Sequence, residues 1–329
     1  MNCVVLGSGG WGTALAQVLC DNGHHVTLWS HQAQTSAKIA GARENPRLPG
    51  VLLPESLAYT ANFAALDNAD LVVFATPSFA VRETARAAAP SLKDGAVLVS
   101  VSKGIERDTN LRMTEIIAQE VGESCKVVAL SGPSHAEEVG RRIPTGCVAA
   151  HADEAVAKIV QDAFMADYFR IYTSDDIVGV ELAGALKNVV ALSCGVIDGM
   201  GCGDNTKALL MTRAMAEMGR LGQQLGGRRD TFAGLAGMGD LIVTCTSMHS
   251  RNRRAGILIG QGKSAQEAME EVGAVVEGYY AAASVHQLAQ RVGVEMPICE
   301  CAYQVLYHGH STQDVVRQLM TRAKRKENE

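Results

Sequence analysis

The stretch Leu6-Gly-Ser-Gly-Gly-Trp-Gly12 decides the fold of this chain. Gly7, Gly9 and Gly12 have the G-x-G-x-x-G spacing of a turn that holds a dinucleotide. In such a turn the first glycine permits the tight bend, the second lets backbone N–H groups approach a pyrophosphate, and the third lets the helix pack closely on the strand. The N-terminus of that helix adds about half a positive charge, which attracts the anion.

The residues on either side complete a βαβ unit. Residues 3–6 (C-V-V-L) predict a short buried strand, and residues 26–29 (V-T-L-W) predict a second strand. Between them, residues 13–19 (T-A-L-A-Q-V-L) have the apolar periodicity of a helix that Gly23 can end. Because strand, glycine turn, helix and strand follow in this order, we favour nucleotide binding over a structural glycine turn.

The composition excludes several classes of function. Of the 329 residues, 47% are hydrophobic and 20% are charged, and the net charge is −5, which gives no electrostatic reason to expect nucleic-acid or membrane-surface binding. The nine cysteines form no paired C-x-x-C framework, so we expect free thiols and a cytoplasmic location. The most apolar segment, residues 182–201, contains Lys187 and Asp198, and we therefore expect no membrane span.

The chain divides into two parts with different periodicity. Before residue 174, Val- and Leu-rich runs alternate with helical stretches, which is typical of a mostly parallel sheet covered on both faces; the later strands could pair antiparallel. From residue 174 onward every periodic stretch is helical. We predict a Rossmann-like doubly wound α/β domain over residues 1–173 and an all-helical domain over residues 174–329. The further strands are predicted at 71–75, 96–100, 126–130, 146–149 and 169–172, and the further helices at 79–89, 109–121, 153–164, 176–197, 206–225, 250–259, 264–271, 279–292 and 312–324.

The end of the second strand bears on the choice of dinucleotide. A carboxylate about 20 residues after the glycine turn would hold the ribose 2′-OH of NAD. This strand ends instead in Ser30 and His31, which can hydrogen-bond to a 2′-phosphate and do not repel it, although both also fit an ordinary loop. We expect NADP(H), with NAD(H) also accepted.

Polar turns follow three of the predicted strands, at the sheet edge where doubly wound folds bind ligands. They are residues 75–78 (A-T-P-S), 102–104 (S-K-G) and 131–136 (S-G-P-S-H-A). Lys103 lies in the second turn, where a ligand-binding role and plain solvation fit equally well.

Lys187 stands in the middle of a predicted apolar helix. Small and apolar residues occupy the positions three and four away on both sides, so no carboxylate on its own helix face can pair with it. Burial there would lower the pKa of the lysine toward neutrality, which suits proton transfer. The alternative is a lysine that extends its ammonium group to water.

A further group of candidate residues lies later in the chain. Asp240 comes after a glycine-rich turn, and Arg251 opens a helix with Ser250 and Asn252 beside it, which is an arrangement suited to clamping an oxyanion or phosphate. Taken separately, these two segments are explained equally well as an ordinary glycine turn and a basic surface helix. Glu277, in V-V-E-G, is explained equally well as a carboxylate at a helix start.

These segments together resemble the NAD(P)-dependent glycerol-3-phosphate dehydrogenases of the bacterial soluble type, over essentially the whole chain. The most specific pieces are G-S-G-G-W-G-T-A-L-A (7–16), S-K-G (102–104), S-G-P-S-H-A-E-E-V (131–139), G-V-E-L-A-G-A-L-K-N-V (179–189), G-D-N-T-K-A-L-L-M-T-R-A-M-A-E-M (203–218), A-G-M-G-D-L-I-V-T-C (236–245), S-R-N-R-R (250–254) and V-V-E-G (275–278).

The resemblance implies reversible NAD(P)H-dependent reduction of dihydroxyacetone phosphate to sn-glycerol 3-phosphate, which supplies glycerophospholipid biosynthesis. It implies that Lys187 transfers the proton, that Asp240 and Thr244 orient this lysine, and that no metal is needed. It places Lys103, Gly132, Ser134, Lys187, Asp240, Ser250, Arg251 and Asn252 at the substrate. It places Gly7, Gly9, Gly10, Trp11, Gly12, His31, Lys103, Ala136, Arg251, Val275 and Glu277 at the cofactor.

Two departures from the family pattern and two alternatives remain. Many members have Ser at position 10, and its hydroxyl group contacts the pyrophosphate; Gly10 cannot make this contact. Members with an arginine near His31 have a stronger 2′-phosphate clamp. The chain could instead be a related two-domain hydroxyacid or ketoacid dehydrogenase, with Arg251 clamping a carboxylate, or a nicotinamide-sensing module without turnover. The resemblance is compatible with a homodimer but does not require one.

Overall fold

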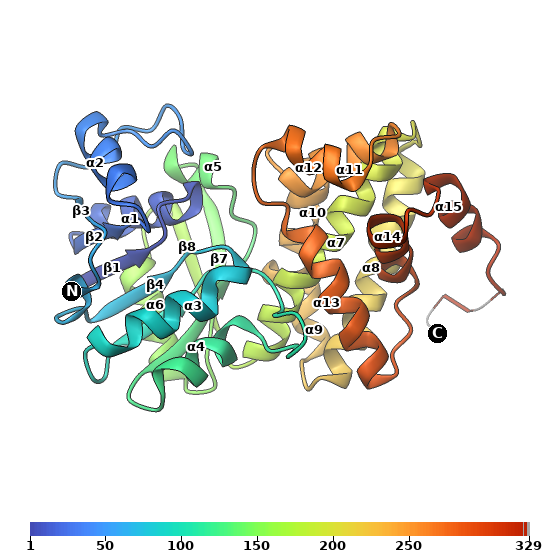
Figure 1. The fold of residues 1–329 in the computed structure, drawn as a ribbon. Helices are drawn as coiled ribbons and strands as arrows, with labels where there is room; N and C mark the ends of the chain where they lie inside the picture. Colours follow the sequence, from blue (N-terminus) through green and yellow to red (C-terminus); the bar gives the residue numbers. More distant parts are fainter. Residues whose placement is uncertain (325, 328–329) are drawn as a thin grey trace.

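The computed structural model describes residues 1–324 and 326–327, which form two lobes (Figure 1). The N-terminal lobe is a sheet flanked by helices, and the described part of the C-terminal lobe is helical. The predicted fold class, a Rossmann-like α/β part followed by an all-helical part, is confirmed. The domain boundary after residue 173 stays a prediction; the last strand ends at Ser174 and the next helix begins at Ile177.

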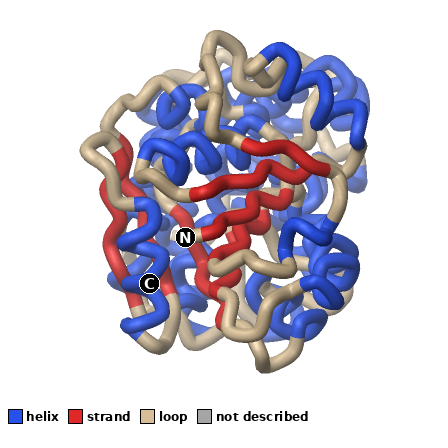
Figure 2. The backbone as a smooth tube through the Cα atoms, turned by 90° about the vertical axis from the view of Figure 1, so that its left-hand side faces the viewer, coloured by secondary structure: helices blue, strands red, loops and turns tan. Residues whose placement is uncertain are grey.

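Eight strands form one sheet in the order β3-β2-β1-β4-β5-β6-β7-β8 (Figure 2). Neighbouring strands are parallel except β6 and β7, which pair antiparallel. The strand order reverses between β1 and β4, and this switch point is where doubly wound sheets bind ligands. The strands are β1 (Asn2–Leu6), β2 (His25–Trp29), β3 (Ala58–Thr60), β4 (Leu71–Phe74), β5 (Val97–Ser100), β6 (Lys126–Ser131), β7 (Thr145–Ala150) and β8 (Phe169–Ser174).

Both faces of the sheet are covered by helices. Successive residues of a strand point to opposite faces, so on β1 Val5 joins one buried cluster with Leu15, while Leu6 joins another with Phe74. This double burial explains why the strand sequences are continuously apolar. The helices of this lobe are α1 (Gly10–Asp21), α2 (Ala33–Ala42), α3 (Val81–Ala88), α4 (Met113–Val121), α5 (Ala136–Gly140) and α6 (Glu154–Phe164).

The sequence does not predict β3, α2 or α5, which are short or weakly patterned. β3 has three residues, and the buried residues of α2 are Ser36 and Ile39, so neither has a clear apolar period. The helix predicted over 109–121 begins later, at Met113, because Asp108 and Asn110 adopt positive φ values of 70° and 58° in the preceding turn. α1 begins three residues earlier than predicted, at Gly10.

The C-terminal lobe is built around α7 (Ile177–Gly199), which lies at its centre (Figure 1). Among the described residues, α7 is the one helix long and apolar enough to cross a membrane, but 89% of its apolar stretch is buried inside the protein. Such burial is typical of the core helix of a globular lobe. The helices around it are α8 (Asp204–Gln224), α9 (Arg229–Ala233), α10 (Asp240–Thr246), α11 (Arg251–Gly260), α12 (Ala265–Val272), α13 (Glu277–Val292), α14 (Pro297–His308) and α15 (Thr312–Met320).

Glycines let α7 and α11 approach each other closely. A Cβ added at Gly195 would lie 2.1 Å from the carbonyl oxygen of Arg253, and one at Gly256 would lie 2.0 Å from the carbonyl oxygen of Leu192. Side chains at these positions would therefore push the two helices apart. The close crossing brings the start of α11 beside the middle of α7.

Other parts of this lobe differ from the prediction. The sequence does not predict α9, α10 or α14, and the last helix ends at Met320 instead of residue 324. The glycine-rich stretch before Asp240 is a π-helical turn (Leu235–Gly239) that leads directly into α10. Cys299 and Cys301 are buried in α14, and all nine cysteines are free thiols, as predicted.

Candidate active site

The glycine turn has the geometry that its spacing predicts. Gly7 has φ +124°, and a Cβ there would lie 2.7 Å from the carbonyl oxygen of Ala75. A Cβ at Gly12 would lie 2.0 Å from the carbonyl oxygen of Gly7. The helix α1 can therefore pack on the turn only because residue 12 has no side chain. At Gly9 a Cβ would have no atom of the described residues within 4 Å, and the space in front of the turn is therefore open. This cradle fits an anionic pyrophosphate.

Gly10 is required by the neighbouring loop. A Cβ at Gly10 would lie 2.6 Å from the carbonyl oxygen of Arg47 and 3.5 Å from the Cβ of Ala136. The loop is fixed because the buried amide of Asn45 donates to the carbonyl oxygen of Ser8 at 3.0 Å. The departure from serine at position 10 thus has a steric reason in this chain.

The residues after β2 leave a hydroxyl unsatisfied. Ser30 is 2% exposed, and its Oγ has no hydrogen-bond partner among the described residues. His31 is exposed, with its ring 6.2 Å from that of Trp29. Neither Ser30 nor His31 carries a negative charge that would repel a 2′-phosphate.

Trp11, a predicted cofactor residue, directs its side chain into the protein. Its ring packs on the core, with its centroid 6.4 Å from that of Phe169. As the second residue of α1, Trp11 also has a backbone N–H that finds no acceptor inside the helix.

Five predicted residues converge where the two lobes meet. The Nζ of Lys187 donates to Oγ1 of Thr244 at 2.8 Å and lies 3.1 Å from Oδ1 of Asp240. The Nζ of Lys103, from the N-terminal lobe, lies 2.5 Å from Oδ2 of the same Asp240 and donates to the carbonyl oxygen of Gly132 at 3.0 Å. One buried carboxylate thus joins two lysines from the two lobes.

The electrostatics of this cluster suit proton transfer. Burial lowers the pKa of Lys187 to about 8, although the carboxylate of Asp240 opposes the shift. Burial by itself would raise the pKa of Asp240, but the charges of Lys103 and Lys187 outweigh it, and the pKa is lowered. At neutral pH Lys187 is therefore an ammonium group close to its titration point.

Ser134 completes the N-terminal side of the cluster. Its Oγ lies 3.5 Å from the Nζ of Lys103 and donates to the carbonyl oxygen of Gly132 at 2.9 Å. The loop after β6 therefore holds the ammonium group of Lys103 beside Asp240.

The start of α11 is tied to α7 and α13 by side chains predicted to bind substrate. Oγ of Ser250 accepts a hydrogen bond from the backbone N–H of Arg253 at 3.2 Å, as an N-cap does. The amide of Asn252 donates to Oδ1 of Asn188 at 2.9 Å and accepts from the backbone N–H of Gly278 at 2.8 Å. Arg251 itself is exposed. The structure therefore gives Ser250 and Asn252 positioning contacts that the sequence does not predict.

Glu277 links the two lobes at the start of α13. Its carboxylate accepts hydrogen bonds from the backbone N–H and the Oγ of Ser78, at 3.0 Å and 2.5 Å. Burial raises the pKa of Glu277. Val275, two residues earlier, is half-buried.

Sequence reasoning missed Asn188 and Asn45. Asn188 donates to the carbonyl oxygens of Lys103 and Gly184, at 3.3 Å and 3.4 Å, and so joins α7 to the N-terminal lobe. An amide beside Lys187 in an otherwise apolar helix is the signal that could have identified it. No comparable sequence signal marks Asn45, because its partners lie in the glycine turn and α1.

The matches to known protein families fall on the same two parts of the chain. The family profile described as "NAD-dependent glycerol-3-phosphate dehydrogenase N-terminus" matches residues 2–157, and the corresponding C-terminus profile matches residues 176–317. The "Glycerol-3-phosphate dehydrogenase [NAD(P)+]" of Moorella thermoacetica is 51% identical over 327 residues, covering 99% of this chain and 97% of its own length. The protein of the same name from Pelotomaculum thermopropionicum is also 51% identical, covering 99% of this chain and 94% of its own.

Solved structures agree with the sequence comparison. The crystal structure of glycerol-3-phosphate dehydrogenase from Coxiella burnetii has a TM-score of 0.93 and 36% identity, covering 97% of this chain and 98% of its own. The D-mandelate dehydrogenase complex with NADH, at 16% identity and a TM-score of 0.64, shares the fold alone. The predicted resemblance, the oxidoreductase class and the use of NAD(P) are confirmed. The chain belongs to the NAD-dependent glycerol-3-phosphate dehydrogenase family.

Proposed function

We propose that the chain catalyses the reversible NAD(P)-dependent interconversion of dihydroxyacetone phosphate and sn-glycerol 3-phosphate, with Lys187 as the proton-transfer group. The observation that carries this assignment is the buried position of Lys187, whose Nζ is hydrogen-bonded to Thr244 and lies 3.1 Å from Asp240. A lysine with a pKa of about 8 can be both acid and base near neutral pH.

In reduction, the ammonium group of Lys187 protonates the carbonyl oxygen of the ketone as negative charge builds on it. Asp240 and Thr244 hold the Nζ of this lysine in place. In oxidation, neutral Lys187 takes the proton back from the hydroxyl. General acid–base catalysis of this kind contributes roughly 10²–10⁴-fold to the rate.

The phosphate group of the substrate needs positively charged side chains to bind it, and two such side chains lie where the two lobes meet. Lys103 reaches this region from the N-terminal lobe, and Arg251 is exposed at the start of α11. The N-terminus of α11 adds its own partial positive charge. Gly132 and Ser134 lie beside Lys103, while Ser250 and Asn252 fix the start of α11.

The cofactor supplies the hydride, and the residues present fit it. Gly7, Gly9 and Gly12 would hold its pyrophosphate at the start of α1, and the open position at Gly9 supports this placement. The unsatisfied Oγ of Ser30, with His31 beside it, supports binding of the adenosine ribose at the end of β2. Gly10, Trp11, Ala136, Val275 and Glu277 are the remaining proposed cofactor positions.

The test is the loss of reduced-nicotinamide absorbance when the purified chain meets dihydroxyacetone phosphate, with NADPH and NADH in parallel. We expect oxidation with both, faster with NADPH. A panel of 2-keto acids serves as the control for the hydroxyacid alternative. A chain that binds NADPH but oxidises it with none of these substrates would contradict the proposal. A supply role in glycerophospholipid synthesis and a cytoplasmic location are proposed with this activity.

A further inference from the structure

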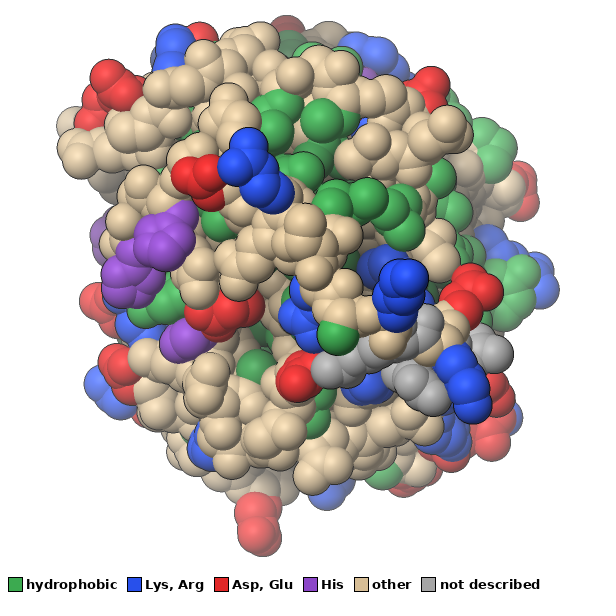
Figure 3. Space-filling view, turned by 90° about the vertical axis from the view of Figure 1, so that its right-hand side faces the viewer, with side chains coloured by type: hydrophobic (Ala, Val, Ile, Leu, Met, Phe, Trp, Pro, Cys, Tyr) green, Lys and Arg blue, Asp and Glu red, His purple; other side chains and the backbone are tan. Residues whose placement is uncertain are grey.

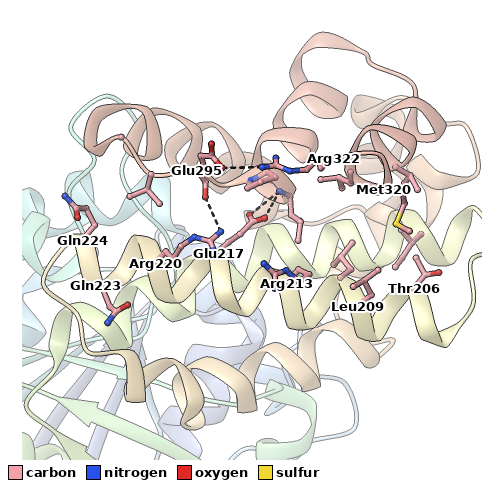
Figure 4. Close-up of a pocket in the computed structure, with 18 residues that line it drawn as sticks. Thr206, Leu209, Arg213, Glu217, Arg220, Gln223, Gln224, Glu295, Met320 and Arg322 are labelled. Atoms are coloured by element: carbon pink, nitrogen blue, oxygen red, sulfur yellow. Dashed lines mark hydrogen bonds and ion pairs between the residues drawn. The ribbon is translucent and has the colours of Figure 1, made fainter. Parts of the chain in front are cut away.

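A cavity of about 790 Å³ lies in the C-terminal lobe, and none of the residues proposed for substrate or cofactor lines it. Its walls come from the end of α7, from α8, from the loop between α13 and α14, from the start of α14, and from α15 with Arg322 just after it (Figure 4). Small-molecule sites typically have volumes of about 300–1,000 Å³. The cavity therefore has the size of a ligand site separate from the catalytic cluster.

One part of the cavity carries charged groups from three segments. Arg213, Glu217 and Arg220 lie four and three residues apart on α8 and so share one face of the helix. Glu295 and Arg322 lie across from them (Figure 4). Arg322 Nη2 is 3.3 Å from Oε2 of Glu295, and Arg220 donates to the backbone carbonyl of Glu295 at 3.3 Å.

Among the residues that the structure describes, the positive charges in this part exceed the negative ones, because three arginines line it together with two glutamates. Glu217 is 3% exposed, and the backbone N–H of Ile298 donates one bifurcated hydrogen bond to its two carboxylate oxygens. Burial raises the pKa of Glu217 to about 7, so part of its charge is absent at neutral pH. Arg213 donates to the neutral carbonyl of Glu327 at 2.8 Å, which leaves its charge uncompensated by that contact. An anionic group is therefore favoured here.

The adjoining part of the cavity is apolar and open to solvent. Leu209 and Met320 line it, yet they are 47% and 67% exposed, and Figure 4 shows both on the same side of the charged group. Ile197 of α7 and Leu319 of α15 extend this wall. Figure 3 looks onto the outer side of the C-terminal lobe and shows hydrophobic side chains gathered beside Lys and Arg side chains. Covering such surface with an apolar ligand gains about 25 cal/mol per Å².

We propose that this cavity binds a single-chain amphipathic anion, with its anionic head on Arg213 and Arg220 and its alkyl chain against Leu209 and Met320. Carboxylate and phosphate heads share the chemistry that guanidinium groups recognise. The site lies outside the proposed reaction, so its presence does not depend on the proposed substrate.

The first experiment is calorimetric titration of the full chain with dodecanoate and with dodecyl phosphate, each below its micelle-forming concentration. We expect one site per chain for both anions, and the tighter of the two identifies the preferred head. Affinity should rise about fourfold per added methylene from octanoate to dodecanoate. Butyrate and dodecyltrimethylammonium should bind at least about tenfold more weakly than dodecanoate, since one lacks the chain and the other the negative charge.

Variants then locate the site. Arg213→Gln and Leu209→Glu should each weaken dodecanoate binding about tenfold or more, which corresponds to 1.4 kcal/mol. Arg317→Gln, on an exposed part of α15 that does not line the cavity, and Ile159→Glu, on α6 of the other lobe, are the matched controls and should bind like the wild type. Thermal unfolding of every variant separates loss of the site from loss of the fold, and Leu209 is exposed enough to change without unfolding the lobe.

Several results would overturn the proposal. They are the absence of saturable binding by the wild type, equal binding of dodecyltrimethylammonium, no dependence on chain length, and unchanged binding in both cavity variants. Sedimentation of the wild type and of Leu209→Glu tests whether this face instead joins two copies of the chain. A wild-type dimer that Leu209→Glu dissociates would identify this face as an interface between two copies of the chain.

Discussion

Oδ1 of Asp240 lies 3.1 Å from the Nζ of Lys187, and this contact opposes the lowering of the lysine pKa by burial. The two residues are on different helices, α7 and α10, and both are buried. Burial disfavours the ammonium group of Lys187, whereas the carboxylate of Asp240 favours it. Because Lys103 shares the same carboxylate, the charge of Lys187 is only partly compensated.

Lys187→Met should reduce turnover in both directions by about 10²–10⁴-fold, because it removes the proposed proton-transfer group without adding a charge. The affinity for NADPH should stay within a few-fold of wild type, since the glycine turn lies in the other lobe. Steady-state kinetics and NADPH fluorescence titration measure the two effects. Turnover within a few-fold of wild type would exclude Lys187 from the chemistry.

The two directions of the reaction should depend oppositely on pH around the pKa of Lys187, which is about 8. Reduction needs the ammonium form and should decline as the pH rises above 8, whereas oxidation needs the neutral amine and should increase over the same interval. Asp240→Asn removes the charge that raises this pKa, so both profiles should move to lower pH. Profiles of kcat that keep the same midpoint in the variant would contradict the coupling.

Two glycine substitutions should separate cofactor binding from folding. Gly9→Ala puts a Cβ into open space, so the melting temperature should stay near wild type, while NADPH affinity should fall about tenfold because the pyrophosphate approaches there. Gly12→Ala puts a Cβ 2.0 Å from the carbonyl oxygen of Gly7 and should destabilise the fold by about 1–3 kcal/mol. Thermal melts and NADPH titrations of both variants are the measurements. Equal loss of stability in the two would show that the space at Gly9 is needed for packing.

Ser30→Asp should shift the cofactor preference from NADPH toward NADH. A carboxylate at the end of β2 repels a 2′-phosphate and can accept hydrogen bonds from a ribose 2′-OH. The ratio of kcat/KM for NADPH to that for NADH should fall on the order of 100-fold, because like charges in contact cost several kcal/mol. Ser30→Ala is the control for loss of the buried hydroxyl. A ratio unchanged by the aspartate would place the adenosine ribose elsewhere.

Glu217→Gln should flatten the pH dependence of stability. Burial raises the pKa of Glu217 from 4.5 to about 7, so its contribution to stability is present below pH 4.5 and is lost as the pH rises to 7. The loss amounts to about 3 kcal/mol. Urea unfolding at pH 5 and pH 8 should show a smaller difference in unfolding free energy for the variant. Equal differences in both proteins would mean that Glu217 titrates normally in the fold.

Much of the fold could be predicted because its signals are local. The glycine turn and the continuous Val/Leu strands are read from consecutive residues, and seven of the eight strands lie where the sequence predicts them. Of the elements that were missed, β3 has only three residues, and its place depends on pairing with β2, which no local window of sequence reveals. α14 was missed although its buried residues Ile298, Ala302 and Leu306 lie at helical spacing.

The sequence by itself determined the nucleotide-binding unit, the change to a helical second half and the apolar surroundings of Lys187. It did so because backbone sterics and apolar periodicity act over a few residues. Only the tertiary structure decided that Asp240 pairs with both Lys103 and Lys187. Only the tertiary structure showed that the carbonyl oxygen of Arg47 leaves no room for a side chain at Gly10. These contacts join residues from different elements, and the close packing of α7, α11 and the two lobes brings them together.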